Sequence, residues 1–406
     1  MTKEKSTVPR LRFPGFTDAW KQRKLGEFMK ESKILGSKGD IARKLTVRLW
    51  GRGVVSKKEI YSGSSATQYY IRKSGQFIYG KLDFLNQAFG IIPPELDGYE
   101  STLDSPAFDL LKGINGQFLL EFVSRKEFYY YQGNIANGSR KAKRIHTETF
   151  LGMPISLPTL PEQEAIGSFF SDLDQLITLH QRKLDDVKEL KKALLQKMFP
   201  KGNGNDFPEL RFPEFTDAWK QRKLGEVVSI SSGYTGDASL SNGKYKLTRI
   251  ETISDGNVDV SRTGFSNELP DEKYRLKFGD ILFSNINSLA HIGKVAIFNI
   301  GEEVFHGINL LRLVPKQDLI NPYFIYYQLV TESKKNWSKS HANQAVNQAS
   351  INQTSLSIQK ISLPTLPEQE AIGSFFSDLD QLITLHQRQL DHLKLLKKAL
   401  LQQMFI

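Results

Sequence analysis

The chain of 406 residues contains no cysteine. This absence excludes disulfide bonds, thiolate metal ligands and a cysteine nucleophile. The N-terminal stretch MTKEKSTVPRLRFPGF lacks an apolar core of signal-peptide length. No run of the sequence approaches the roughly 18 apolar residues that a membrane helix needs. We therefore expect a cytoplasmic protein.

The familiar motifs of catalysis are also missing. The sequence has no GxxxxGK[ST] motif, no GxGxxG motif after a predicted strand and no metal-ligand spacing among its seven histidines. NPYF at 321–324 lacks the second proline of the amino-methyltransferase motif, so we interpret its aromatic residues as core. PDEK at 270–273 lacks the rest of a nuclease motif. These absences favour a non-catalytic binding protein without a metal or cofactor of its own.

What the sequence does have is positive charge. Its 55 Lys and Arg against 44 Asp and Glu give a formal net charge of +11. The excess is uneven, because residues 28–154 carry +7 and residues 227–360 carry only +2. A basic balance is typical of proteins with a polyanionic partner, most often nucleic acid, although a basic soluble protein without one fits as well.

Two segments of the sequence occur twice. Residues 155–199 and 361–405 agree at 40 of 45 positions, and residues 9–27 and 208–226 agree at 17 of 19. The inserts between them, 28–154 and 227–360, have no convincing sequence similarity. The pattern predicts a first domain (1–154), a first spacer helix (155–199), a linker (200–207), a second domain (208–360) and a second spacer helix (361–406).

The longer repeat predicts a helix of about 38 residues, about 57 Å long. Pro161 and Pro367 suit a first helical turn, and apolar residues recur at spacings of three and four. Acidic residues fill the first half of each copy and lysines the second half, so antiparallel pairing places opposite charges together. The same gradient also suits each helix dipole without any partner. The residues expected to pair the helices are Ile166, Phe170, Leu173, Leu176, Ile177, His180, Leu184, Ile372, Phe376, Leu379, Leu382, Ile383, His386 and Leu390.

The two histidines on this stripe allow two interpretations. A wet ring at the edge of the seam is the simpler one. Alternatively, full antiparallel overlap brings His180 and His386 close together near a pseudo-twofold axis.

Polar and basic segments of both inserts are candidates for DNA contact. Lys and Arg neutralise phosphates, whereas Arg, Asn and Gln read base edges. Each such segment is also compatible with an ordinary solvated loop. The candidates are Lys57, Lys58, Tyr61, Arg140, Lys141, Lys143, Arg144, Asn285, Asn287, Ser288, His291, Lys294, Lys334, Lys335, Lys339 and Asn343.

The repeated LPTLPEQEAIGSFF, the repeated FTDAWKQRKLGE and the order of repeats and inserts resemble the specificity subunit of type I restriction-modification systems. This resemblance covers nearly the whole chain. It implies an α+β fold with two globular target-recognition domains, joined by two long helices that form an antiparallel coiled coil with pseudo-twofold symmetry. Each domain then reads one half of a bipartite DNA target, and the helices set the spacing between the halves.

The resemblance also implies partners and their cofactors. Two methyltransferase subunits that bind S-adenosylmethionine are expected on the repeated segments. Two restriction subunits are expected to use ATP and Mg²⁺ for translocation and cleavage, and this chain itself holds no catalytic residue. The alternative from the residues alone is a protein-interaction scaffold with two unrelated ligand-binding modules.

Overall fold

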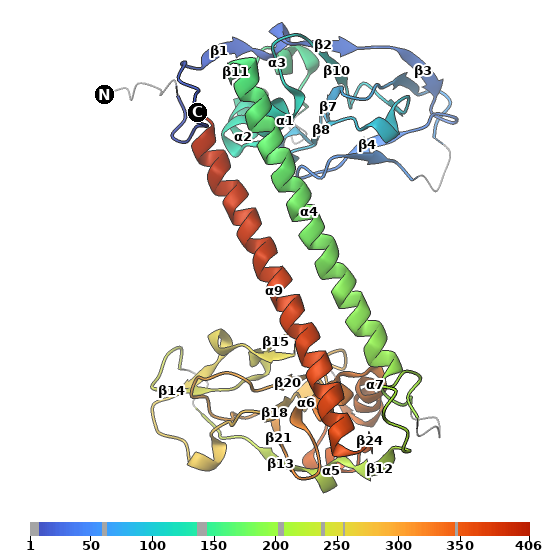
Figure 1. The fold of residues 1–406 in the computed structure, drawn as a ribbon, viewed down its shortest axis with the longest axis vertical. Helices are drawn as coiled ribbons and strands as arrows, with labels where there is room; N and C mark the ends of the chain where they lie inside the picture. The colour runs from blue at the N-terminus through green and yellow to red at the C-terminus, as the bar shows by residue number, and fades with distance from the viewer. Residues whose placement is uncertain are drawn as a thin grey trace. The chain divides into compact units, whose positions relative to one another are not determined.

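The computed structural model describes residues 8–58, 63–135, 144–201, 207–236, 240–254, 256–345 and 348–406. Its contacts divide the chain into two compact units. The first unit comprises residues 1–181 and 388–406, and the second comprises residues 182–387. Each of the two long helices therefore begins in one unit and ends in the other (Figure 1). The predicted boundaries had kept each helix whole, whereas the compact units divide both helices.

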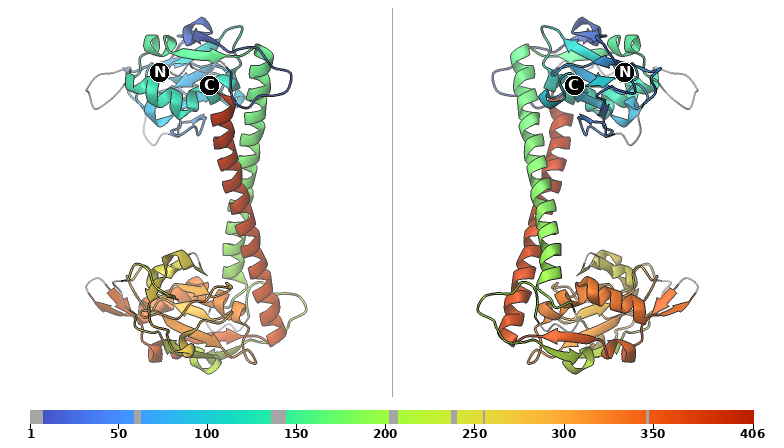
Figure 2. Two further views of the ribbon diagram at one scale, coloured as in Figure 1. Left: turned by 90° about the vertical axis from the view of Figure 1, so that its left-hand side faces the viewer. Right: turned by 90° about the vertical axis from the view of Figure 1, so that its right-hand side faces the viewer.

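The first unit is a mixed α/β body that lies on one side of its helix segments (Figure 2). Its central sheet has the order β2-β10-β7-β8, and β1 pairs with β11 beside it. Smaller sheets β3-β6-β9 and β4-β5 complete the unit. The elements are β1 (Lys21–Lys24), β2 (Met29–Ser32), β3 (Leu35–Lys38), β4 (Leu45–Val47), β5 (Val54–Ser56), β6 (Gln68–Ile71), β7 (Phe77–Tyr79), β8 (Phe89–Ile91), β9 (Glu100–Ser101), β10 (Ala107–Leu110), α1 (Gly116–Ser124), α2 (Lys126–Ile135), α3 (Thr147–Leu151), β11 (Pro154–Leu157) and the start of α4 (Leu160–Lys197).

The second unit has a six-stranded sheet of order β13-β21-β18-β20-β16-β15. Sheets β12-β24, β14-β17 and β19-β23-β22 surround it. The elements are β12 (Lys220–Lys223), α5 (Leu224–Val227), β13 (Val228–Ser232), β14 (Tyr245–Leu247), β15 (Ile253–Ser254), β16 (Asn257–Val258), β17 (Gly264–Ser266), β18 (Ile281–Phe283), β19 (Ile286–Asn287), β20 (Val295–Ile297), β21 (Leu311–Pro315), α6 (Pro322–Val330), α7 (Glu332–His341), β22 (Asn343–Ala345), β23 (Gln348–Ser350), α8 (Gln353–Ser357), β24 (Lys360–Leu363) and the start of α9 (Leu366–Met404).

The two inserts share a fold despite their dissimilar sequences. The strand order β2-β10-β7-β8 of the first unit recurs as β13-β21-β18-β20 in the second. Helices α1, α2 and α3 and strand β11 recur as α6, α7, α8 and β24, each 206 residues later. The repeat therefore extends well beyond the segments that the sequence identified. What differs most is the chain between β2 and β7, compared with the chain between β13 and β18, and the connection after α2 or α7.

One hydrogen-bonded arrangement fixes each insert to its long helix. Asn115 accepts a bond from the Phe118 N–H at the start of α1, and its own N–H donates to Gln163 Oε1 on α4 at 3.0 Å. A Cβ at Gly167 would lie 2.6 Å from Asn115 Oδ1, so this position of α4 needs glycine.

The second unit repeats this arrangement. The Asn321 N–H donates to Gln369 Oε1 at 3.0 Å, and a Cβ at Gly373 would lie 2.7 Å from Asn321 Oδ1. The only helical glycine of each spacer copy is thus explained by this close approach.

Within each unit the long helices run antiparallel, as their charge gradient predicts. In the first unit the Phe170 ring centroid lies 6.1 Å from that of Phe405, and Asp174 pairs with Lys397 at 2.7 Å. In the second unit the Phe376 and Phe199 centroids lie 6.1 Å apart, and Asp380 pairs with Lys191. The acidic half of one helix meets the basic half of the other in both units.

Most residues of the predicted pairing stripe face the interior. Ile166, Phe170, Leu173, Leu184, Ile372, Phe376 and Leu390 are buried, and Ile177, Leu379 and Ile383 are half-buried. Leu176 and Leu382, however, are 40% and 38% exposed. Neighbouring residues point about 100° apart on a helix, so these two leucines lie at the exposed edge of the stripe, and their part in helix pairing stays a prediction. His180 and His386 are half-buried, and their mutual approach stays a prediction.

Lys397 also contacts the first insert, through Glu121 of α1 at 3.2 Å. Burial raises the pKa of the Glu121 carboxyl, Lys397 opposes the rise and Asp174 adds to it. A carboxyl whose pKa is higher in the folded than in the unfolded protein destabilises the fold as pH rises through that pKa. Glu121→Gln should therefore make the first unit more stable than the unmodified protein at pH 7, with the difference vanishing near about pH 4. Thermal unfolding measured across this pH range checks the prediction, and a less stable variant at pH 7 would contradict it.

Candidate nucleic-acid interface

The predicted contacts of the first unit are only partly described. Lys57 and Lys58 directly follow β5 and are exposed. Arg144 is exposed as well, and its Nη1 lies 3.4 Å from Asp104 Oδ1. Tyr61, Arg140, Lys141 and Lys143 lie outside the described residues. In element order, residues 136–143 fall between α2 and α3, where the second unit has β22 and β23.

In the second unit, one small sheet brings together two segments that are far apart in the sequence. Strand β19 pairs with β23, which pairs with β22, so Asn287 lies opposite Ala349 and Asn343 opposite Ser350. Asn343 is exposed at the start of β22. The sheet thus places polar side chains of the 283–294 and 332–348 segments on one structure.

Several of these polar groups already have partners within the fold. Asn285 Nδ2 donates to the Ile351 carbonyl, and Asn287 Nδ2 donates to Ser284 Oγ. The Ser288 N–H donates to Asn287 Oδ1, and Ser288 Oγ lies 2.9 Å from His291 Nδ1. These bonds shape the turn after β19, while Ser288 and His291 keep their exposure.

A cleft of about 450 Å³ gathers lysines in the second unit. Lys294, Lys335 and Lys339 line it together with Lys191 of α4, above apolar residues that include Ile292 and Val295. Glu332 is the one acidic residue of this lining, and it lies 3.3 Å from Lys335. Three of the predicted lysines therefore converge, and the cleft has a net positive lining suited to a phosphate group.

Lys334 does not join this cleft. Its Nζ donates to the Lys360 carbonyl at 2.6 Å, and burial lowers its pKa to about 8. Its position corresponds to the buried Phe128 of the first unit, 206 residues earlier. We therefore assign Lys334 to the packing of α7, so its predicted DNA contact is not supported by its placement.

The sequence did not identify Lys191 and two tyrosines as candidates for nucleic-acid contact. Lys191 lies far from the inserts in sequence, in a helix interpreted only as a spacer. Tyr130 and Tyr131 of α2 are 50% and 62% exposed and come shortly before the basic segment at 140–144. Exposed aromatic rings are a usual feature of nucleic-acid surfaces, and the YYY run was the available signal.

Within the described ranges, no group of three or more His, Asp or Glu side chains could hold a metal ion. In the same part of the chain, no helix is long and apolar enough to cross a membrane.

The fold is that of a restriction-modification specificity subunit. The chain is similar to the type I restriction-modification system S subunit from M. genitalium, with a TM-score of 0.63, 14% identity and coverage of 98% of this chain and 99% of that one. It is also similar, with a TM-score of 0.51 and 18% identity, to a chain solved in work on complex assembly and conformational transition of the type I R-M system, with coverage of 95% and 97%.

The family follows from the sequence match. The model of the type I restriction modification DNA specificity domain matches residues 18–189 and again residues 216–395, and the chain belongs to this family. It is 42% identical over 205 residues to the MjaX specificity subunit of Methanocaldococcus jannaschii, covering 49% of this chain and 48% of that protein. It is 28% identical over 267 residues to the MjaVIII specificity subunit of the same organism, covering 63% and 62%. The matches thus span from about half to less than two thirds of these relatives.

Proposed function

We propose that this protein is the specificity subunit of a type I restriction-modification system, which binds a bipartite DNA target with one half-site on each unit. The observation that carries the proposal is the contrast between the repeated segments, which form a common frame (9–27 with 155–199, and 208–226 with 361–405), and the inserts between them. The two units share the order of their central β-strands, their helices and the hydrogen bonds that hold each insert to its long helix, and they differ most between β2 and β7 or β13 and β18. A pair of readers for two different half-sites needs this combination.

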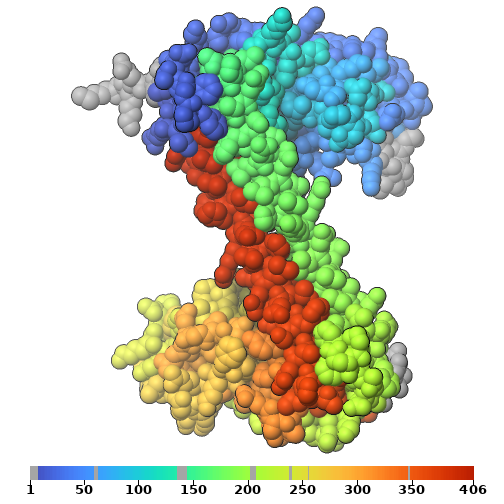
Figure 3. Space-filling model, in the orientation of Figure 1, coloured from blue at the N-terminus to red at the C-terminus, as the bar shows by residue number. Residues whose placement is uncertain are grey.

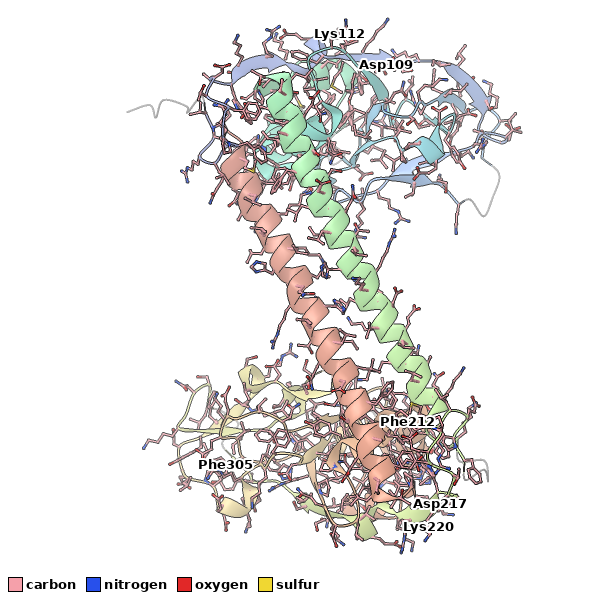
Figure 4. The ribbon with its side chains drawn as sticks, in the orientation of Figure 1. Asp109, Lys112, Phe212, Asp217, Lys220 and Phe305 are labelled. Atoms are coloured by element: carbon pink, nitrogen blue, oxygen red, sulfur yellow. The ribbon has the colours of Figure 1, made fainter. Side chains whose placement is uncertain are left out.

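The repeated frame is the proposed docking surface for partner subunits. Identical partners need identical surfaces related by symmetry. Arg12 binds Glu162 and Arg211 binds Glu368 in equivalent ways, and Phe212, Asp217 and Lys220 of the second frame segment lie beside the first turns of α9 (Figure 4). We expect two methyltransferase subunits with S-adenosylmethionine there, and two restriction subunits with ATP and Mg²⁺ in the complete enzyme. The specificity chain itself supplies binding and no catalysis.

The lysine cleft of the second unit is the proposed phosphate contact. Lys294→Gln combined with Lys339→Gln should weaken binding about equally for all DNA sequences. It should also reduce the slope of log affinity against log salt by about 2, because each lost phosphate contact lowers it by about 0.9. Titration of the assembled complex with duplex DNA at several salt concentrations measures this. Lys192→Gln, an exposed position outside the cleft lining, is the matched control.

Mapping of methylated adenines in cells that carry the complete system tests the function itself. A split target sequence that changes when one insert is exchanged supports the proposal. A flat salt response together with tight binding of a protein ligand would instead favour the interaction scaffold.

A further inference from the structure

The hairpin of β4 and β5 ends in a tip, residues 48–53, with the sequence RLWGRG. Arg48, Leu49, Trp50, Gly51 and Arg52 are all exposed, and Trp50 is 56% exposed. The other three tryptophans are not: Trp20 and Trp219 are 4% and 2% exposed, and Trp337 is half-buried. The chain therefore presents one tryptophan to solvent, at the end of a hairpin.

The backbone at the tip does not favour this residue. Trp50 and Gly51 have φ angles of +61° and +66°. Two consecutive positive φ angles are the requirement of a type I′ turn, for which Asn-Gly is the preferred pair. A bulky side chain in this conformation is strained, and such strain persists only where the surroundings hold it in place. Trp50 is thus a residue that the turn itself does not select.

The surroundings hold the backbone of the tip in place and leave the Trp50 ring exposed to solvent. The Trp50 N–H donates to the Asn86 carbonyl at 2.7 Å, and the Gly51 N–H donates to the Gln87 carbonyl at 3.1 Å. Behind the tip, Leu45, Val47 and Val54 pack in a buried cluster of the first unit. Among the described residues, no ring contact and no cation contact involves the Trp50 indole. The fold fixes where the indole points without using it for packing.

The charge around the tip indicates its partner. Arg48 and Arg52 flank Trp50, and neither forms an ion pair within the described part of the chain. Lys57 and Lys58 are exposed as well, but they follow β5 at the end of the hairpin away from the tip. The hairpin also lies between β2 and β7, where the two units differ, so the repeated frame does not account for it.

We propose that this tip is a wedge for duplex DNA: the Trp50 indole inserts against a base step, while Arg48 and Arg52 bind the flanking phosphates. The inference rests on the proposed function and adds the means by which the first unit deforms its half-site. Apolar side chains of minor-groove proteins unstack base steps in this way. A pre-fixed wedge loses little freedom on binding, which explains why the strained turn is retained.

Trp50→Asn separates binding from folding. Asn suits the left-handed conformation and creates the preferred Asn-Gly pair, so the variant should be at least as stable as the unmodified protein. Its affinity for a duplex that carries the mapped target should fall between about fivefold and a hundredfold, the range of one aromatic–base stack. Trp50→Phe should retain part of the affinity. Ile41→Asn, which removes another exposed apolar residue of the same unit, should change little.

The experiment uses the complete complex with duplexes that carry 2-aminopurine at successive positions of the target. Fluorescence should rise at one step with the unmodified protein and not with Trp50→Asn. Unchanged affinity and fluorescence in Trp50→Asn would overturn the wedge. The wedge would also be overturned if Trp50→Asn lost stability or partner binding while its DNA binding stayed intact. Failure of the unmodified complex to bind any duplex would overturn the DNA function itself and the wedge with it.

Discussion

Phe405→Ala should destabilise the first unit by about 3–5 kcal/mol, the usual loss for a buried phenylalanine. Phe405 is 5% exposed at the end of α9, and its ring lies 5.3 Å from Phe118 and 6.0 Å from Trp20 between centroids. The Arg125 guanidinium lies 4.7 Å from the same ring and donates to the Ile406 carbonyl. The last residues of the chain thus complete a core formed mainly by residues 20–173.

The second unit offers the matched variant. Phe199 is 4% exposed at the end of α4, with its ring 5.5 Å from Phe324 and 6.1 Å from Trp219. Phe199→Ala should destabilise the second unit by a similar amount. Leu395→Ala, at a position 66% exposed, should change stability by no more than about 0.5 kcal/mol.

Hydrogen exchange resolved by peptide measures these effects, because it reports the opening of each unit separately. Phe405→Ala should increase exchange in α1 and β10, and Phe199→Ala in α6 and β21. Increased exchange in the opposite unit, with the unit that holds the ring unaffected, would refute this assignment of the helix ends.

The N-terminal segment shows why the sequence predicted the frame and missed its connections. The repeats predicted two long helices, and α4 and α9 confirm them over 38 and 39 residues. Nothing in the periodicity indicated that the Leu11 N–H donates to the Gln403 carbonyl at 3.0 Å. Figure 3 shows the dark-blue segment after residue 8 against both the green start of α4 and the red end of α9. Such contacts join residues hundreds of positions apart, and local pattern carries no information about them.

The shared fold of the inserts was hidden for a different reason. The two units keep similar burial and hydrogen bonding at equivalent positions without keeping the same residue types. Glu121 of the first unit and Tyr327 of the second occupy equivalent positions, and both contact the ion pair between the long helices. A short signal was present, because Ile-Asn-x-x-Phe occurs at 114–118 and again at 320–324. Asn115 and Asn321 attach each insert to its long helix, whereas the sequence led us to interpret the second motif only as aromatic core.

The residues of the candidate site also differ in how far the sequence could predict them. Charge and composition identified Lys294, Lys335 and Lys339, which line one cleft, because surface cations are visible in any sequence. Charge and composition could not distinguish Lys335, which lines the cleft, from the neighbouring Lys334, which binds the Lys360 carbonyl instead. Trp50 was overlooked because its backbone angle and exposure, rather than its residue type, make it unusual.

Arg12→Ala should cost the first unit about 3–5 kcal/mol, because it strands a buried charge. Arg12 donates from Nε and Nη2 to the two carboxylate oxygens of Glu162 at 2.6 and 2.7 Å. The Glu162 side chain is fully buried. The loss should come mainly from this uncompensated carboxylate, so Arg12→Ala should cost much less when Glu162→Gln is already present. Equal losses in both backgrounds would contradict this origin.

Arg211→Ala, the equivalent change in the second unit, should destabilise its unit less, because one further hydrogen-bond donor contacts Glu368. Arg211 binds Glu368 with the same two-bond geometry, at 2.7 Å for both bonds. There, however, Trp219 Nε1 also donates to Glu368 Oε1 at 3.3 Å, so the carboxylate keeps one partner in Arg211→Ala. In the first unit, the indole N–H of Trp20 is buried without a partner among the described residues. One hydrogen bond to a charged group contributes about 1.5–3 kcal/mol, and the two variants should differ by up to this amount in unit-resolved hydrogen exchange. Equal destabilisation of the two units would show that the tryptophan donor contributes nothing, and adding Trp219→Phe to Arg211→Ala should remove any difference that is observed.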